Sequence, residues 1–501
     1  MSLSIPGAGR LGLVEFSMAC GSILLLCAIG VALSRRRQTT SDFFLGGRRI
    51  PGWAVVLSFV ATEVSAMTVI GVPATTYREN WQYMQFVIGS AAARVVVAFL
   101  FIPAFYRFDC TTIYEYLLHR FGPLTQYTAT LFFFVTRLLA SGVRLMAACL
   151  AVAVLLDWPI APVIAAFSVV SILYIGAGGV RAVVWTNVVQ ALVILAAGAA
   201  TVVFILHKVD GGLVEVVRTA EAAGRLDFWN SGPSLRGGDF LRGLLSDPNI
   251  AFVALLNGFF HSMAAFGTDH ELMQRLLTVR TRRVSRDTLL WTLLASTAVC
   301  VLYMAVGTCL FAYYGQHPEL ALPEGLDKIY PHFAAQVMTP VLRGLVLTAI
   351  VMASIDSPLA SLSASFVTDL YRPLIRRDAS ESHYVAVSRV SILFFGAALA
   401  AIAYVFSFQD RMLWLAFKIG GVTYGCLLGV FLLGLLTRRR ANRANVAAMT
   451  SMALVNLVLL ILSEKGILPL GWSWLVILGT FGTIGIAVAL GPLMDPDPGT
   501  A

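Results

Sequence analysis

The chain has 501 residues, of which 58% are hydrophobic and 13% charged, and its mean hydropathy is +0.81. This charge content is about half that of an average soluble domain, which excludes a water-soluble globular fold. The formal net charge of +9 comes from arginine clusters at the ends of apolar runs. It therefore indicates membrane topology, and we expect no nucleic-acid partner.

Apolar runs of about 20 residues or more, the length needed to cross a bilayer, recur along the whole chain. The first begins near residue 11 without a cleavage site of small residues, so we expect a retained span and not a signal peptide. The polar stretch 208–248 is too short for a domain and is predicted to be an extracellular loop with a short surface helix. In all, the pattern predicts thirteen spans: 11–34, 51–75, 83–106, 122–156, 159–177, 183–207, 249–273, 287–314, 333–367, 384–407, 412–436, 444–463 and 470–492.

The arginines predict the orientation of these spans, because cytoplasmic loops are enriched in basic residues. With the N-terminus outside and the C-terminus in the cytoplasm, the cytoplasmic gaps contain Arg35 to Arg37, Arg48, Arg49, Arg107, Arg120, Arg181, Arg280, Arg282, Arg283, Arg286, Arg376, Arg377 and Arg438 to Arg440. The short opposite gaps contain few basic residues, namely Arg78, Lys328, Arg411 and Lys465, and one of them contains Asp157. A missed or invented span would invert this bias in the gaps that follow it, so the bias supports a multi-pass protein of the cell membrane.

A carboxylate and several hydroxyl groups occupy the middle of the second predicted span. They are Ser58, Thr62, Glu63, Ser65 and Thr68, and Gly71 and Pro73 follow them. An unbroken helix facing lipid would not tolerate these groups. A helix unwound at mid-membrane could use its free carbonyls for a cation and its hydroxyls for a substrate. The alternative is a hydroxyl-rich packing face from which Glu63 reaches toward water.

Later spans also carry costly polar groups. Arg137 and Arg144 lie on roughly the same face of the fourth span. One of them could bind an anionic substrate, and the alternative is pairing with Glu63 or Asp269. Asp269 and Glu271, at the cytoplasmic end of the seventh span, are either solvated boundary residues or part of a gate or ion pair.

The sixth, ninth and eleventh spans add further polar candidates. Thr186, Asn187 and Gln190 of the sixth span point inward. Lys418, near the start of the eleventh, is ambiguous between a residue reaching toward the membrane surface and a functional group. Helical spacing places one stripe on the ninth span, with Asp356 beside it: Ile350, Ala353, Ser354, Ser357 and Ser361. The hydroxyls alone would suit helix packing, but a buried aspartate favours a cation or proton partner.

Motifs of several enzyme classes are missing from the sequence. It has no P-loop, HExxH or GxSxG motif and no cluster of metal ligands, so we do not expect an enzyme. Its seven cysteines lie mostly within apolar runs and are predicted to be reduced packing residues.

Four segments, in this order, closely resemble the sodium/solute symporter family: Ala61 to Ser65 before Gly71 and Pro73, Gly178 to Gln190, Ser354 to Ser357 leading to Thr368 to Tyr371, and Gly429 to Gly434 ahead of Arg438 to Arg440. The resemblance implies an all-α membrane protein of the LeuT type, in which 1–501 form a single transport domain. Its two inverted five-helix repeats would be 51–207 and 249–436, with one extra helix before them and two after.

The resemblance also implies where sodium binds. The better-known sodium site of the family maps to Ala61, Val64, Ile350, Ala353 and Ser354. Ala353 departs from the pattern because alanine lacks the first hydroxyl ligand, which a water or Asp356 could replace. A second site would involve Asn187, Asp356 and Ser357. Sialic-acid-transporting members have an aspartate at the position of Asn187, so our hypothesis is that a carboxylate has moved to Asp356.

For the substrate, the resemblance to sialic-acid and sugar symporters implies six residues: Glu63, Ser65, Thr68, Tyr83, Gln85 and Arg144. Arg144 matches an arginine that binds a substrate carboxylate, whereas Glu63 replaces a threonine. The implied function is sodium-coupled symport of a small polar organic solute, such as a sugar, sialic acid or another carboxylate, by alternating access. The alternatives are a proton-coupled symporter on the same fold and, less in keeping with the short C-terminal tail, a membrane sensor without transport.

Overall fold

A computed structural model describes residues 12–34, 44–233, 240–355, 358–408 and 412–496, and all regular structure in these ranges is helical. The side chains of residues 31, 33, 34, 174–179, 326, 354, 355 and 412 are not described. The α-helices of the first half are α1 (Leu13–Ser34), α3 (Gly52–Glu63), α4 (Ala66–Arg78), α5 (Tyr83–Val96), α6 (Ile102–Arg107), α7 (Ile113–Arg120), α8 (Pro123–Leu156), α9 (Ile160–Lys208), α10 (Gly212–Ala222) and α11 (Phe240–Ser246).

The second half of the chain continues the bundle. Its α-helices are α12 (Ala251–Thr268), α13 (His270–Leu277), α14 (Arg282–Gln316), α15 (Ile329–Gln336), α16 (Pro340–Ile355), α17 (Leu359–Ser365), α18 (Arg372–Leu374), α19 (Glu381–Phe406), α20 (Met412–Leu436), α21 (Asn442–Glu464) and α22 (Leu475–Met494). Two π-helices are η2 (Val97–Phe101) and η4 (Phe366–Tyr371), and three short 3-10 helices are η1 (Gly46–Arg48), η3 (Leu326–Lys328) and η5 (Trp472–Trp474).

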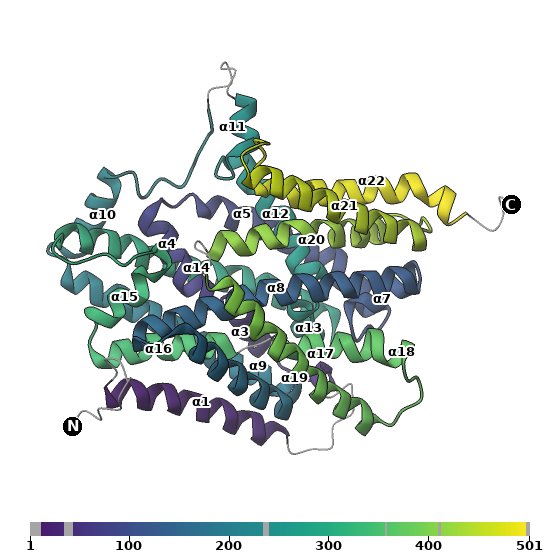
Figure 1. Cartoon of the computed structure of the whole chain (residues 1–501), viewed down its shortest axis with the longest axis horizontal. Coiled ribbons are helices and arrows are strands. Elements are labelled where there is room, and N and C mark those ends of the chain that lie inside the picture. Colours follow the sequence, from purple (N-terminus) through teal and green to yellow (C-terminus); the bar gives the residue numbers. More distant parts are fainter. Residues whose placement is uncertain (1–11, 35–43, 234–239, 356–357, 409–411, 497–501) are drawn as a thin grey trace.

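The long helices lie side by side, with α1 and α22 along opposite sides of the bundle (Figure 1). Within the described residues, ten helices are long and apolar enough to cross a membrane, and the bent pair α3–α4 adds an eleventh. Two shorter apolar helices, Ile160–Leu173 and Pro340–Ala353, accompany them. The prediction of an α-helical protein with many membrane spans is confirmed, whereas the count of thirteen stays a prediction.

The second predicted span is broken, as its polar residues indicated. Helix α3 ends at Glu63, α4 begins at Ala66, and the two are bent by 58°. Between them, Val64 and Ser65 have extended backbones, with ψ of 90° and 178°. Buried apolar side chains from α3, α4, α8, α12, α14 and α16 form one continuous core around this break.

Four other predicted spans differ from the structure. The fifth and sixth are joined in α9, whose 49 residues run from Ile160 to Lys208 through the predicted cytoplasmic gap at Arg181. The ninth, predicted as one helix over 333–367, is divided among α15, α16 and α17. Pro340 and Pro358 explain these divisions, because proline lacks the backbone donor needed inside a helix. The seventh ends at Thr268, because the Asp269 carboxylate accepts from the Glu271 N–H and so caps a new helix, α13.

Helices α5 and α12 pack closely because two glycines face the opposite backbone. A Cβ atom on Gly89 would lie 2.2 Å from the carbonyl oxygen of Leu255, and one on Gly258 would lie 2.2 Å from that of Phe86. Small residues allow such approaches between membrane helices. This contact holds the start of α5 beside α12 and so fixes one wall of the central cavity described below.

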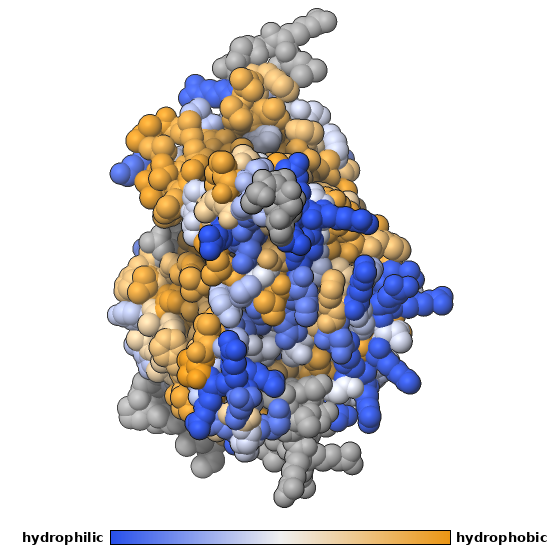
Figure 2. Space-filling view, turned by 90° about the vertical axis from the view of Figure 1, so that its right-hand side faces the viewer, coloured by the Kyte–Doolittle hydropathy of each residue, from blue (hydrophilic) through white to orange (hydrophobic). Residues whose placement is uncertain are grey.

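The end of the molecule that carries α7, α18 and the end of α22 is distinctly polar. Hydrophilic side chains gather over its centre and one side, while hydrophobic side chains cover the opposite margin (Figure 2). Several cytoplasmic gaps predicted from the sequence contain exposed arginines near helix ends. They are Arg107, Arg280, Arg282, Arg283, Arg372, Arg376, Arg377, Arg438, Arg439 and Arg440. The distribution suits a membrane protein with one strongly basic face.

Candidate functional site

The break between α3 and α4 exposes backbone carbonyls in the middle of the molecule. Arg144 of α8 donates from Nη2 to the carbonyls of Thr62 at 2.9 Å and Glu63 at 3.2 Å. No backbone donor among the described residues reaches the carbonyls of Ala61 or Val64. In an unbroken helix these two carbonyl oxygens would accept hydrogen bonds from backbone N–H groups one turn later. Here they are available to a cation.

A small pocket lies between the end of α3 and the end of α16. Its volume is about 30 Å³, and Ala61, Ser65, Ser141 and Ala353 are among its lining residues. A single water needs about 10–15 Å³ by this measure, so the pocket has the size of an ion with one water. The buried hydroxyls of Ser65 and Ser141 have no hydrogen-bond partner among the described residues. The pocket thus offers hydroxyl oxygens that could coordinate a cation, and its volume suits one ion with one water.

The residues predicted for sodium are only partly described. Ala61 and Ala353 line the same pocket, and Ile350 is buried one turn before Ala353 in α16. Asp356 and Ser357 lie outside the described residues, and so does the side chain of Ser354.

Asn187, predicted for the second sodium site, is buried against α3. Its amide donates to Thr62 Oγ1 at 3.0 Å and to Ser58 Oγ at 3.3 Å. These contacts tie α9 to the helix that breaks, and Asn187 does not line the small pocket.

A larger cavity of about 200 Å³ opens on the other side of the break. Of the six residues predicted for the substrate, Glu63, Thr68, Tyr83 and Arg144 line it. Ser65 lines the small pocket instead. Gln85 lines neither pocket, because its side-chain amide accepts from the Asn230 N–H and donates to the Asn249 carbonyl, both in the region of the predicted extracellular loop.

Glu63 is held in place by a partner that the sequence analysis missed. Its carboxylate forms an ion pair with Arg94 of α5 and accepts from Ser296 Oγ of α14 at 2.5 Å. Arg94 also donates to Thr292 Oγ1 at 2.7 Å, and its guanidinium lies 4.4 Å from the centre of the Phe266 ring. The predicted alternatives, pairing of Glu63 with Arg137 or Arg144 or a free carboxylate reaching toward water, are wrong.

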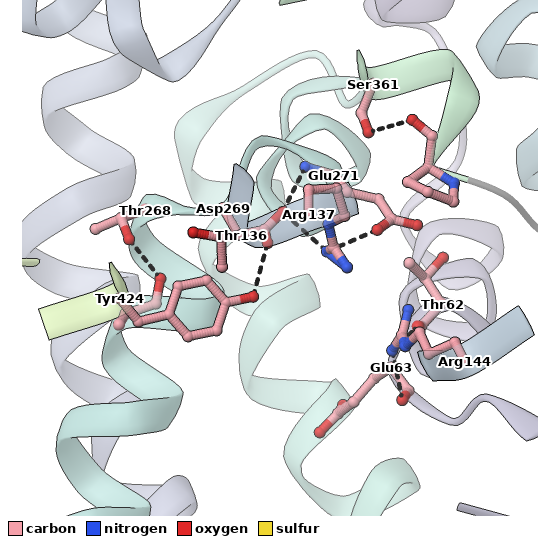
Figure 3. A network of polar contacts seen from close by, with 12 residues as sticks. Thr62, Glu63, Thr136, Arg137, Arg144, Thr268, Asp269, Glu271, Ser361 and Tyr424 are labelled. Atoms are coloured by element: carbon pink, nitrogen blue, oxygen red, sulfur yellow. Dashed lines mark hydrogen bonds and ion pairs between the residues drawn. The ribbon is translucent and has the colours of Figure 1, made fainter. Parts of the chain in front are cut away.

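Arg137 closes the opposite end of the cavity with two buried carboxylates (Figure 3). Its guanidinium lies 2.9 Å from Asp269 and 2.6 Å from Glu271, and each of these side chains is at most 4% exposed. Tyr424 of α20 donates to Asp269 at 2.9 Å. Of the two interpretations of Asp269 and Glu271, solvated boundary residues are excluded and the ion pair is confirmed.

Aromatic rings form the remaining wall. The ring centre of His261 lies 4.9 Å from that of Phe417, 5.4 Å from Tyr424 and 6.1 Å from Phe86, and Tyr83 stacks on Phe86. His261 is 8% exposed, lines the cavity, and its Nδ1 has no hydrogen-bond partner among the described residues. The cavity therefore offers an apolar wall with one unused polar atom.

The remaining polar candidate of the later spans lies at the surface. Lys418 pairs with the exposed Glu464 at 2.8 Å, outside the central cavity. This position favours the interpretation of Lys418 as a residue that reaches toward the membrane surface.

Two cavity residues could have been found in the sequence. Arg94 is a charged residue inside the third predicted span, and His261 a titratable one inside the seventh, so the cost of burying them marks both as functional candidates. Ser296 gave no such signal, because a serine within a membrane helix commonly bonds to its own helix.

Comparisons with known proteins agree with this geometry. The family model of the Sodium:solute symporter family matches residues 43–454. The sodium/sialic acid symporter SiaT of Proteus mirabilis is 28% identical over 498 residues, which cover 97% of this chain and 96% of that protein. Human sodium-coupled monocarboxylate transporter 1 is 28% identical over 441 residues, which cover 86% of this chain and 70% of the transporter.

Solved structures give the same result. A substrate-bound, outward-open Na⁺-coupled sialic acid symporter with a novel Na⁺ site superposes with a TM-score of 0.84 at 25% identity, covering 97% of this chain and 99% of that one. Mhp1, a nucleobase-cation-symport-1 family transporter in a closed conformation, shares the fold alone, with a TM-score of 0.53 at 14% identity and 92% and 97% coverage. The predictions of a LeuT-like helical fold and of sodium as the coupled ion are thereby confirmed, and the chain belongs to the sodium:solute symporter family.

Proposed function

We propose that the chain uses the sodium gradient to accumulate a small organic anion by alternating access. The observation that carries this proposal is Arg144, which lines both the ion-sized pocket and the larger cavity and binds the backbone between them. A membrane potential of 100 mV contributes about 2.3 kcal/mol per sodium ion. A tenfold sodium gradient adds about 1.4 kcal/mol per ion. With one sodium ion per monovalent anion no net charge crosses the membrane, so the potential does not contribute and accumulation is limited to about tenfold. Two sodium ions per anion would supply about 5 kcal/mol, which is about several thousandfold.

The proposed topology has thirteen crossings, with the N-terminus outside and the C-terminus in the cytoplasm. The bent pair α3–α4, the first part of α9 (Ile160–Leu173) and Pro340–Ala353 of α16 would complete the ten long spans. This count requires the chain to reverse direction within α9, between residues 173 and 180. Opposite positions of the start of α1 and the end of α22 support an odd number of crossings (Figure 1). We assign 51–207 and 249–436 to two inverted repeats and 208–248 to an extracellular loop, in which α10 supplies the expected surface helix.

Sodium is proposed to bind in the small pocket. The carbonyls of Ala61, Val64 and Ile350 would be ligands, together with the hydroxyl of Ser354. Ala353 has no hydroxyl to offer, so a water or Asp356 would take the place of that ligand. The free hydroxyl of Ser65 supports a role for this residue on the ion side of the break, in place of the substrate role that we first expected. Asn187, Asp356 and Ser357 remain the proposed second site.

A small monocarboxylate fits the larger cavity better than a sugar acid. Arg94 pairs with the partly exposed Glu63, and Arg137 pairs with the buried Asp269 and Glu271. Arg144 is therefore the cavity arginine that has no ion-pair partner among the described residues. Its guanidinium can donate to one substrate carboxylate. The volume of about 200 Å³ is only moderately larger than the ~150 Å³ cavity that holds benzene, and the aromatic wall suits an apolar remainder.

The test measures uptake into proteoliposomes containing the purified protein. Small monocarboxylates, aromatic monocarboxylates, sialic acid and neutral sugars are each offered with a sodium gradient or with potassium in its place. We expect sodium-dependent uptake of a monocarboxylate. Uptake driven by a pH gradient without sodium would instead identify a proton-coupled symporter, and sodium-dependent uptake of sialic acid alone would refute the size argument.

Arg144 provides the corresponding variant. Arg144→Gln should lower the affinity for the carboxylate by at least tenfold, because a hydrogen bond to a charged group contributes about 1.5–3 kcal/mol. The matched control is Arg48→Gln, which removes an arginine paired with the exposed Asp109 at 2.8 Å and should leave uptake unchanged. Equal affinities in wild type and Arg144→Gln would contradict the proposed role.

A further inference from the structure

A second large hollow lies away from the transport cavity, at the basic end of the molecule. It is an open groove of about 760 Å³ between the end of α6, the end of α7, the start of α14 and the end of α20. Four arginines line it, three from α6, α7 and α14 and one from the segment after α20: Arg107, Arg120, Arg282 and Arg438. No acidic residue lines the groove, so four positive charges face one open volume.

Three of these charges have no countercharge. Arg107, Arg282 and Arg438 are exposed and form no ion pair or side-chain hydrogen bond with any other part of the chain that the structure describes. Arg120 is different, because it donates to the carbonyls of Gly434 at 3.1 Å and Thr437 at 2.6 Å. It thereby fixes the floor of the groove, where α7 meets the end of α20.

The remainder of the groove is apolar and continues onto the lipid-facing surface. Leu100, Pro103, Phe108 and Leu435 line it beside the arginines. Immediately next to these residues in the chain, Phe99 is 57% exposed and Leu436 is 66% exposed. Because both lie within membrane-spanning segments, a ligand in the groove would have charge at one end and hydrocarbon along the other.

We propose that this groove binds one anionic glycerophospholipid of the leaflet on the side of the C-terminus. The phosphate group would lie among the guanidinium groups of Arg107, Arg282 and Arg438, which can donate several hydrogen bonds to phosphate oxygens. The acyl chains would run over Leu100, Pro103 and Leu435. Free phosphate would leave this apolar wall uncovered, and basic pockets between membrane helices are a known form of lipid headgroup site.

Bound lipid would clamp four elements of the transporter together. Three of the arginines belong to α6, α7 and α14, and Arg438 lies two residues after the end of α20. Helices α14 and α20 also contribute Ser296 and Tyr424 to the transport cavity. A ligand that binds this arrangement stabilises it by mass action. The lipid is therefore expected to stabilise the folded protein without entering the transport cavity.

The experiment uses the full-length protein in nanodiscs of pure phosphatidylcholine or of phosphatidylcholine with phosphatidylglycerol. We compare wild type with Arg107→Gln/Arg282→Gln/Arg438→Gln by thermal unfolding and by native mass spectrometry of retained lipid. Each arginine near a membrane surface contributes about 1 kcal/mol, which is about fivefold in affinity. The triple variant should lose about a hundredfold in phosphatidylglycerol affinity and most of the thermal stabilisation by that lipid.

A charge-matched control separates the groove from the general basic surface. Arg280→Gln/Arg376→Gln/Arg377→Gln removes three exposed arginines that do not line the groove and should retain both lipid binding and stabilisation. Equal losses in the two triple variants would overturn the proposal, because the effect would then come from net charge. Stabilisation of the protein in phosphatidylcholine by inorganic phosphate alone would also overturn it, because the apolar wall would have no role.

Discussion

Removing Glu63 from its ion pair with Arg94 should destabilise the protein more than removing Arg94, because the two side chains differ in burial. The Arg94 side chain is 4% exposed, whereas the Glu63 side chain is 24% exposed toward the cavity. In Glu63→Gln, the buried guanidinium loses its countercharge and water cannot replace it. We expect a loss of about 3–5 kcal/mol, the range for breaking a buried pair by removing one partner. A Coulomb energy of about 4 kcal/mol for charges 4 Å apart at an effective dielectric constant of 20 agrees with this range.

The reverse change should cost less. In Arg94→Met, the remaining carboxylate can be hydrated from the cavity and still accepts from Ser296, so we expect a loss of about 1–2 kcal/mol. The double variant Glu63→Gln/Arg94→Met removes both charges and should return to within about 1 kcal/mol of wild type.

Thermal unfolding of the four proteins in one detergent measures this double-mutant cycle. Melting entropy scales with chain length, so 1 kcal/mol corresponds to about 1 °C here and Glu63→Gln should melt about 3–5 °C lower. The control Glu464→Gln breaks the surface pair with Lys418 and should shift the melting temperature by less than about 1 °C. If the double variant melts at the temperature expected from adding the two single losses, the pair has no coupling energy and the reasoning is refuted.

Three further predictions follow from burial and packing. Arg137→Gln leaves two buried carboxylates without a cation and should cost about 3–5 kcal/mol in thermal unfolding; a melting temperature unchanged from wild type would contradict this. Gly89→Ala should reduce the yield of folded protein, because its Cβ would lie 2.2 Å from a carbonyl oxygen, whereas Gly315→Ala has open space and should express normally. Ser65→Ala should lower sodium affinity about tenfold in sodium-dependent thermal stabilisation without lowering stability in its absence, and equal sodium affinity would place Ser65 outside the ion site.

Where polar residues interrupted an apolar run, the sequence predicted the structure well. Glu63 and its neighbouring hydroxyls predicted the break that the structure has at Val64 and Ser65. The reason is that no continuous helix could bury those groups in lipid without cost, so a break was favoured over the alternative of a hydroxyl-rich packing face. The segment Ala61 to Ser65, which contains these residues, is also one of the four on which the family resemblance and its predicted fold were based.

Where several partners were available, the sequence left the choice open. Glu63 had Arg137 and Arg144 as candidate partners, yet Arg94 of the third predicted span holds it. Helical periodicity gives the face of a helix on which a residue lies, but not the helix that packs against that face. The ends of helices were also uncertain in the prediction from sequence. Asp269 could have been a solvated residue at the end of a span, and only its contact with the Glu271 N–H shows that it caps a new helix.

The position of Arg144 offers a physical route for coupling the two proposed sites. Its guanidinium binds the carbonyls of Thr62 and Glu63, so the free carbonyls on either side of this pair, Ala61 and Val64, are held in a fixed arrangement. A substrate carboxylate drawn to Arg144 would weaken the repulsion between this cation and a nearby sodium ion. Sodium would in turn strengthen the field that attracts the carboxylate. Coupling between two ligands is reciprocal, so each must raise the affinity for the other by the same factor. One arginine between the two pockets thus gives a single electrostatic cause for both halves of symport.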